Sequence, residues 1–138
     1  MGGGRAGLHG RTMGLSVVEE GGVLVVEGTP EEHLMSRIDD VNVVLETCFS
    51  NRARLALLYP QNLTGGFFDL SSGEAGSILQ RLRNYGIRLA LVCPPGSVRF
   101  STRFREMLAE EERGSHFKVF EMRHAAREWL ARFAKVEQ

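Results

Sequence analysis

The stretch Phe67–Cys93 has the sequence FFDLSSGEAGSILQRLRNYGIRLALVC and contains the clearest succession of structural signals in the chain. One set of apolar residues recurs at the three- and four-residue spacing of an amphipathic helix: Ala75, Ile78, Leu79, Leu82 and Tyr85. Gly86 follows, and glycine is the residue that most easily takes the left-handed conformation at a helix end. Ile87–Cys93 is then a continuous apolar run stopped by two prolines, which is typical of a buried strand. The stretch therefore predicts a helix followed by a buried strand, the repeating unit of an α/β fold.

The N-terminal part of the chain predicts a β-hairpin. Leu15–Glu20 and Val23–Glu27 are short runs rich in β-branched residues. Gly21 and Gly22 separate them, and two glycines suit the tight turn of a two-residue hairpin. Residues 1–14 are glycine-rich and polar, lack the apolar segment of a signal peptide, and are expected to form a disordered tail.

The residues from Ser36 to Tyr59 predict a helix followed by a strand. Ser36 offers a hydroxyl cap and Asp39 an acid in the first turn, and both are favourable at a helix N-terminus. Apolar residues recur at helical spacing up to Phe49, which is expected on the buried face. Arg54–Tyr59 is a short apolar run that ends at a proline and indicates a buried strand.

The C-terminal third of the chain repeats this pattern. A helix is expected to begin at Ser101 or Thr102 and to end at Gly114, and a strand is expected at residues 117–121. A closing helix is indicated by its apolar face: Ala126, Trp129, Leu130 and Phe133.

These elements follow the order β-β-α-β-α-β-α-β-α and form one domain over residues 15–136. Strands that alternate with helices are joined by right-handed crossovers and run parallel. We therefore expect an α/β fold with a mixed, mostly parallel sheet and an N-terminal hairpin. If successive crossovers step the same way along the sheet, their helices collect on one face. The apolar strands lack polar alternation, so either both faces are covered or one face seats a second copy of the chain.

Length and composition exclude several classes of protein. The 138 residues suit one ordinary domain, and 43% hydrophobic with 25% charged residues is average globular usage. Seventeen basic residues balance 17 acidic ones, so no global field favours nucleic acid. Every apolar run is too short to span a bilayer, and without an export signal the cytoplasm is the expected location.

The sequence contains no recognisable catalytic, metal or cofactor motif. Cys48 and Cys93 are far apart and lie within apolar runs, so they are expected to be small buried side chains. The histidines show no metal-binding spacing, and the glycines match no nucleotide-binding loop. We therefore predict no catalytic residue, no metal and no cofactor.

The serine pair before the central helix has two possible roles. Ser71 and Glu74 have the spacing of a capping box, in which each side chain bonds the other's backbone amide. Ser72 and Gly73 are not explained by this cap. A phosphate on Ser72 would be favoured by the helix N-terminus and repelled by Asp69, so either a cap alone or a regulatory site remains open.

The same stretch resembles a bacterial family of unknown function, domain-of-unknown-function family 4180. The resemblance rests on six short motifs within a stretch of about a fifth of the chain. They are FFDL (Phe67–Leu70), Ser-Gly (Ser72-Gly73), Ala-Gly (Ala75-Gly76), Leu-Gln-Arg (Leu79–Arg81), Asn-Tyr (Asn84-Tyr85) and the strand RLALV (Arg88–Val92). It implies a fold and no established activity.

The element order and the serine-glycine helix start are also similar, more remotely, to STAS domains, the anti-sigma factor antagonists. This resemblance implies that Ser72 is a serine phosphorylated by a kinase-type anti-sigma factor. The sequence departs from the pattern because Leu70 stands at the acidic position, after one inserted residue.

We therefore expect a STAS-like, non-enzymatic regulatory or protein-interaction module of a bacterial cytoplasm. Its partner would be a protein, either an anti-sigma factor of the kinase type or a second copy, with neither nucleic acid nor membrane involved. The predicted contact surface joins the loop 62–66 to the helix start, with these residues at its centre: Asp69, Ser71, Ser72, Gly73 and Gly76.

The alternative expectation is an enzyme or small-ligand-binding protein. In open α/β sheets, ligands bind beyond the carboxyl ends of the strands. The loops after Tyr59 and Cys93 would line that pocket, with Asp69, Ser72 and Cys93 as its polar groups.

Overall fold

The strands pair in their sequence order, β1-β2-β3-β4-β5-β6, to form one six-stranded sheet. The computed structural model describes residues 7–12 and 14–137. The hairpin strands β1, β2 and β3 are antiparallel and β3 to β6 are parallel, so the expected mixed, mostly parallel α/β sheet is confirmed. The strands are β1 (Gly7–Thr12), β2 (Leu15–Glu20), β3 (Val23–Gly28), β4 (Leu55–Leu58), β5 (Arg88–Val92) and β6 (Phe117–Phe120).

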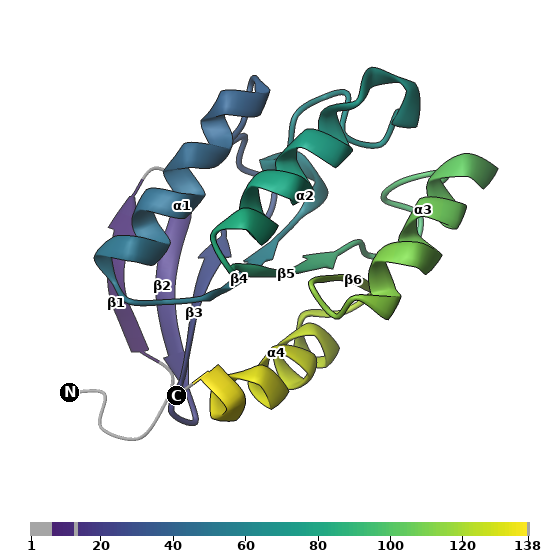
Figure 1. The fold of residues 1–138 in the computed structure, drawn as a ribbon. Helices are drawn as coiled ribbons and strands as arrows, with labels where there is room; N and C mark the ends of the chain where they lie inside the picture. Colours follow the sequence, from purple (N-terminus) through teal and green to yellow (C-terminus); the bar gives the residue numbers. More distant parts are fainter. Residues whose placement is uncertain (1–6, 13, 138) are drawn as a thin grey trace.

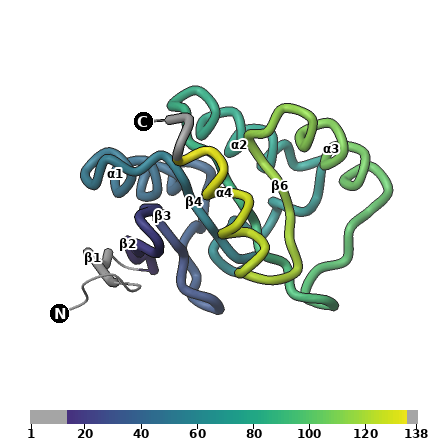
Figure 2. The backbone as a smooth tube through the Cα atoms, turned by 90° about the horizontal axis from the view of Figure 1, so that it is seen from below, coloured from purple at the N-terminus to yellow at the C-terminus, as the bar shows by residue number. Residues whose placement is uncertain are grey.

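Four α-helices cover the two faces of this sheet within the described part of the chain. They are α1 (Val41–Ser50), α2 (Glu74–Asn84), α3 (Thr102–Arg113) and α4 (Arg123–Glu137). The crossovers from β3 to β6 all step in the same direction, and α1, α2 and α3 consequently lie on one face while α4 crosses the other (Figures 1 and 2).

Each face of the sheet has its own hydrophobic core. Alternate strand residues such as Ala56 and Leu58 pack beneath α1 and α2. Their neighbours Leu55 and Leu57 pack against Trp129 and other residues of α4. The strands read as continuous apolar runs because both faces are covered, and no second copy is needed to bury either face.

The predicted hairpin turn is confirmed by its backbone conformation. Gly21 and Gly22 have φ values of 57° and 81°, the left-handed pair that a two-residue turn between twisted strands requires. The prediction of a disordered tail over residues 1–14 is wrong for 7–12, which pair with β2 as strand β1. A polar, glycine-containing edge strand carries no periodic apolar signal, so sequence pattern alone misses it. Residues 1–6 and 13 lie outside the described part.

The segment that leads to α2 is not extended. Phe67 is fully buried and its ring contacts Phe104 and Phe117, while the backbone turns and then forms the short 3-10 helix η3 (Leu70–Ser72). Burial of one aromatic ring in the core therefore determines the path of this loop more than its β propensity does.

Phe49 and Tyr85 were predicted on buried helix faces, and both predictions are wrong. Phe49 is 54% exposed and Tyr85 53% exposed. Each comes at the C-terminal end of its helix, and Phe49 lies beside the buried Cys48 but on the outer side of the same turn.

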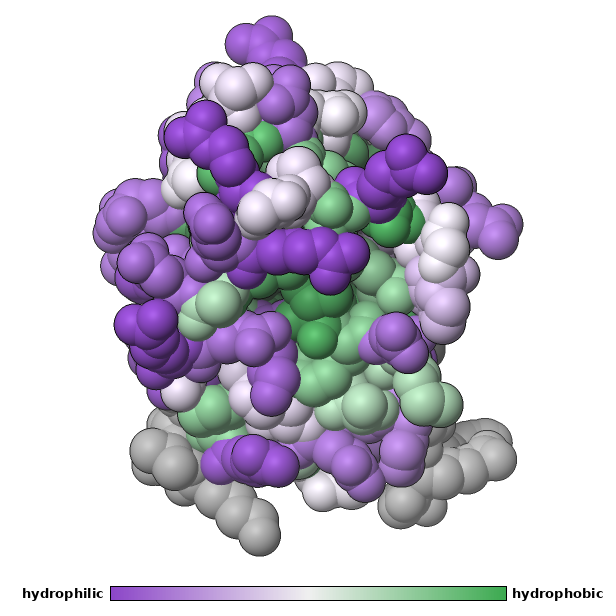
Figure 3. Space-filling model, turned by 90° about the vertical axis from the view of Figure 1, so that its right-hand side faces the viewer, coloured by the Kyte–Doolittle hydropathy of each residue, from purple (hydrophilic) through white to green (hydrophobic). Residues whose placement is uncertain are grey.

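The open edge of the sheet is formed by β6. Apolar side chains form a band across the middle of this side of the molecule, between charged side chains (Figure 3). Partly buried residues of α3 and β6, among them Met107, Leu108 and Val119, pack against the core here.

Candidate functional site

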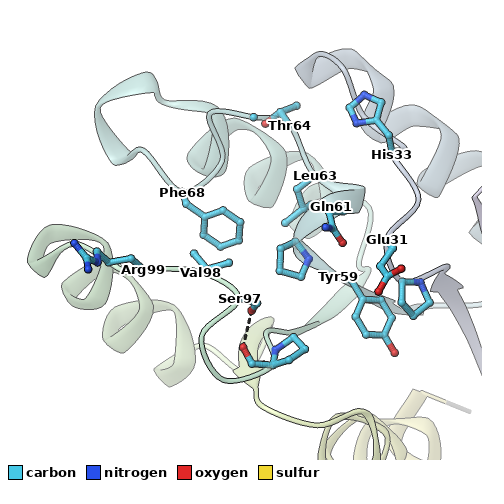
Figure 4. A pocket seen from close by; sticks show the side chains of 14 residues that line it. Glu31, His33, Tyr59, Gln61, Leu63, Thr64, Phe68, Ser97, Val98 and Arg99 are labelled. Atoms are coloured by element: carbon cyan, nitrogen blue, oxygen red, sulfur yellow. Dashed lines mark hydrogen bonds between the residues drawn. The ribbon is translucent and has the colours of Figure 1, made fainter.

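A hollow of about 750 Å³ lies beyond the carboxyl ends of the parallel strands (Figure 4). It is lined by the loops that follow β3, β4 and β5: Pro30, Glu31, His33, Tyr59, Pro60, Gln61, Leu63, Thr64, Gly65, Phe68, Pro94, Ser97, Val98 and Arg99. The loops after Tyr59 and Cys93 therefore meet where the alternative expectation placed them. The volume falls within the usual range of sites for small molecules.

The wall of this strand-end hollow is mainly apolar with a few polar groups. Phe68 and Val98 face Leu63 and Gln61 across it, and Glu31 lies at the far rim beside Tyr59 (Figure 4). Such a lining binds an apolar body and orients it with a small number of hydrogen bonds.

Asn62 holds two of the loops in register. Its side chain is fully buried, and its Oδ1 accepts a hydrogen bond from the Tyr59 amide at 2.7 Å. Its Nδ2 donates to the carbonyls of Thr29 and Glu32 at 2.9 and 2.8 Å. A Cβ at Gly28 would lie 2.1 Å from the Asn62 Oδ1, so glycine is required there. One amide side chain thereby fixes the loop after β3 against the loop after β4.

Thr64 supplies a polar group that the fold itself leaves unused. The residue is 3% exposed, and its hydroxyl oxygen is buried with no hydrogen-bond partner among the described residues. Thr64 also lines the hollow. Buried hydroxyls are nearly always paired, so an unpaired one on a cavity wall indicates a missing partner.

Tyr59 connects the hollow with an ionic cluster beneath α4. Burial, together with the negative charge of Glu27, raises the pKa of the Tyr59 hydroxyl, which therefore remains protonated. The Glu27 carboxylate accepts hydrogen bonds from Arg123 and Arg127, at 2.8 and 3.0 Å to the same oxygen. These charges are paired with one another, so we assign the cluster to fixing α4 on the sheet.

The capping box predicted between Ser71 and Glu74 is not formed. The Ser71 hydroxyl donates to Asp69 Oδ1 at 2.6 Å, and the same oxygen accepts from the Ser71 amide at 3.1 Å. Asp69 therefore caps η3, and Glu74 accepts instead from the Gly66 amide at 3.1 Å. The extra 3-10 turn moves the start of α2 beyond the position that the sequence spacing implied.

Ser72, and not Ser71 as predicted, accepts a hydrogen bond from the backbone at the start of α2. Its hydroxyl donates to the Gly66 carbonyl at 2.7 Å and accepts from the Glu74 amide at 3.1 Å. Gly66 is thus held on both sides, through its carbonyl by Ser72 and through its amide by Glu74. This arrangement fixes the outer wall of the hollow, where Phe68 lies.

The other predicted site residues lie in the same exposed segment. Gly73 has a φ of 77° and precedes α2, and Gly76 lies in its first turn with open space at its Cβ position. Asp69, Ser72 and Cys93 are not among the residues that line the hollow, so the polar groups predicted for it are wrong. Side chains on the loop after β4 take that place.

The cysteines are buried, as expected. Burial raises the pKa of both the Cys48 and the Cys93 thiol to about 12, so both remain neutral and poorly reactive. Within residues 7–12 and 14–137, no group of three His, Cys, Asp or Glu side chains could hold a metal ion. His33 is hydrogen-bonded to the Ser36 hydroxyl at 2.9 Å.

The sequence placed Asn62 and Thr64 within the predicted contact loop 62–66 and assigned neither a role. The available signal was their position, soon after a buried strand that ends at a proline, where polar residues reach the carboxyl edge of the sheet. Both are buried, and Asn62 makes its contacts with the loop after β3, which is distant in the sequence.

Comparison with known proteins gives a family and nothing further. No described helix is long and apolar enough to traverse a bilayer. No curated protein and no solved structure matches the chain. The model of one family, described as a domain of unknown function (DUF4180), matches residues 20–130. The chain therefore belongs to the DUF4180 family.

Proposed function

We propose that this protein binds a small molecule in the strand-end hollow and acts as a binding module rather than an enzyme. The ligand has a mainly apolar body and at least one group that hydrogen-bonds the Thr64 hydroxyl. The observation that carries the proposal is that Thr64 lines a cavity of about 750 Å³ and that its unpaired hydroxyl lies just beneath the wall, where rotation of the side chain would bring it to a ligand. If the loop only connected β4 to α2, the protein would be more stable with this hydroxyl paired or with an apolar residue at position 64.

The substitution Thr64→Val separates binding from folding because valine keeps the shape and removes the hydroxyl. We expect the free protein to become more stable by about 1 kcal/mol, since an unpaired buried polar group is lost. We expect ligand affinity to fall about tenfold, since a hydrogen bond worth about 1.4 kcal/mol is lost. Opposite signs in the two measurements distinguish a binding residue from a structural one.

The binding measurement uses a defined set of fragments and amide chemical shifts. Indole, quinoline, benzamide and hydroxybenzoate serve as probes, and binding is expected to shift the amides of Thr64, Phe68 and Val98. Val98→Trp fills the hollow and is expected to abolish these shifts, whereas Phe49→Ala at the opposite end of the sheet leaves them unchanged. Shifts that survive Val98→Trp, or that never reach these three residues, contradict the proposal.

The second candidate is the expected STAS-like regulatory module of a bacterial cytoplasm, switched at Ser72 by a protein partner of the anti-sigma kinase type. The favouring observation is that Ser72 is exposed while its hydroxyl joins the Gly66 carbonyl to the start of α2. A phosphate on this oxygen removes the proton given to Gly66 and adds charge beside Glu74, so the loop 64–74 would be released.

Intact-mass measurement of the protein from its native host tests this candidate. A phosphorylated form that disappears in Ser72→Ala and persists in Ser71→Ala supports the switch. Absence of a phosphorylated form under every growth condition sampled removes it.

A further inference from the structure

Two exposed aromatic rings meet at the amino ends of the strands, opposite the strand-end hollow. Among the described residues only three large hydrophobic side chains are highly exposed, and Phe49 and Tyr85 are two of them. Their rings contact edge to face, with centroids 5.5 Å apart and planes at 70°. They come from the C-terminal ends of α1 and α2, which lie side by side on one face of the sheet (Figure 1).

A second hollow, of about 380 Å³, opens beside these rings. The hollow is lined by these two rings, by three buried residues and by two arginines: Phe49, Tyr85, Cys48, Ala53, Ile87, Arg52 and Arg54. We call the exposed residues Phe49, Arg52, Arg54 and Tyr85 the amino-end patch. The hollow is too small for a large ligand and large enough for one or two apolar side chains.

Arg52 and Arg54 both carry positive charge in this patch. Arg52 is exposed and forms no ion pair with any described residue. Its backbone has a φ of 56°, the left-handed conformation that follows a helix and usually belongs to glycine. The opposing partial charge of the α1 C-terminus is about half an elementary charge, so the guanidinium still attracts a carboxylate.

We propose that the amino-end patch binds a segment of another protein in which an aliphatic side chain stands next to a carboxylate. The aliphatic side chain enters the hollow between Phe49 and Tyr85, and the carboxylate pairs with Arg52. This binding site is separate from the strand-end hollow and does not depend on the small-molecule proposal.

The charge and the ring geometry disfavour the other occupants. A second copy docked symmetrically on this patch would place Arg52 against Arg52, and like charges at a contact are unfavourable. A nucleic-acid strand needs rings that offer flat faces to successive bases, whereas these rings are nearly perpendicular. A protein segment with an aliphatic side chain next to a carboxylate both fills the hollow and pairs with the positive charge.

The test uses two capped peptides that differ in one residue, acetyl-Gly-Leu-Glu-Gly amide and acetyl-Gly-Leu-Lys-Gly amide. The glutamate peptide is expected to shift the amides of Arg52, Tyr85 and Ile87 with a Kd on the order of 1 mM, a binding free energy of about −4.1 kcal/mol. The lysine peptide is expected to bind at least tenfold more weakly.

Arg52→Glu is the decisive variant because it places a carboxylate where the glutamate peptide should pair, so the preference for that peptide should be lost. Arg132→Glu, a matched change at an exposed position of α4, should leave the preference unchanged. Amide spectra of both variants verify that the fold is retained.

Four results would overturn the proposal. The first two are equal binding of the two peptides and an unchanged preference in Arg52→Glu. The third is self-association in sedimentation velocity that Arg52→Glu abolishes, which would make a second copy the occupant. The fourth is stronger binding of oligothymidylate at the same amides, which would make it a nucleic-acid surface.

Discussion

The two ends of the parallel strands are built differently. At the carboxyl ends three connections are long: the chain runs from β3 to α1, from β4 to α2 and from β5 to α3 through long loops, and only the step from β6 to α4 is short. At the amino ends the helix-to-strand connections are all short, at residues 51–54, 85–87 and 114–116. Long loops enclose a hollow, whereas short ones leave helix-terminal side chains exposed.

This difference separates two ways of presenting a binding surface. The strand-end hollow depends on side chains that hold loops together, above all Asn62 and Ser72. The amino-end patch consists of residues at or beside rigid helix ends, and its geometry follows directly from helix packing. Substitutions of the side chains that hold these loops should therefore lower stability and binding together, whereas those at the second end should separate them.

The largest expected effect is at Asn62. Asn62→Ala removes three hydrogen bonds, one buried and two partly buried, and leaves the Tyr59 amide and the carbonyls of Thr29 and Glu32 without their partner. Each buried group left unpaired is unfavourable by about 1–3 kcal/mol, so we expect a loss of roughly 3–5 kcal/mol in urea unfolding.

Asn51→Ala is the matched control at the amino ends. The side-chain Nδ2 of Asn51 donates one hydrogen bond, to the Thr47 carbonyl at 2.8 Å, and the residue is half-buried. We expect a loss of about 1 kcal/mol or less. If the two asparagine variants lose equal stability, Asn62 does not hold the carboxyl-end loops as described.

The fold was predictable because its signals are local. Gly21 and Gly22 at the hairpin turn, and the apolar run of β5, require only neighbouring residues to interpret. The helix starts were less predictable. The hydroxyl of Ser101 caps α3 as expected, accepting from the Phe104 amide at 3.1 Å. Ser36 instead donates its amide to Asp40 Oδ2, because a 3-10 turn precedes α1.

The candidate site was predictable in position and not in composition. A general property of parallel sheets places it at the carboxyl ends, and the loops after β4 and β5 do meet there. The burial of Thr64 and Asn62 depends on how loops that are far apart in the sequence pack together. The spacing of apolar residues along the chain carries no information on that packing. The amino-end patch was missed because helical spacing assigns Phe49 and Tyr85 to the core, whereas both side chains are more than half exposed at the ends of their helices.

The two serines offer an intermediate effect within the carboxyl-end loops. Ser72→Ala removes both hydrogen bonds of the hydroxyl that joins Gly66 to α2, so we expect a loss of about 0.5–2 kcal/mol, the usual range for a capping residue. Ser71→Ala removes only an exposed bond to Asp69 and keeps the backbone bond, so a few tenths of a kcal/mol, roughly, is expected. Thermal unfolding of both variants measures the difference. A larger loss in Ser71→Ala would restore the capping box that the sequence spacing predicted.

A small stabilising effect is expected at Arg52, at the amino ends. Arg52→Gly relieves a left-handed backbone that disfavours side-chain-bearing residues by roughly 1–2 kcal/mol, partly offset by the greater freedom of glycine in the unfolded chain. We expect a net gain of about 0.5–1 kcal/mol in urea unfolding. Gly73→Ala at the carboxyl ends is the converse change, since its φ of 77° suits glycine, and it should lose stability. If binding is what keeps an arginine at position 52, Arg52→Gly should gain stability and lose the glutamate peptide in the same preparation. A variant that gains stability and still binds the peptide would show that the hollow, and not the charge, determines recognition at this end.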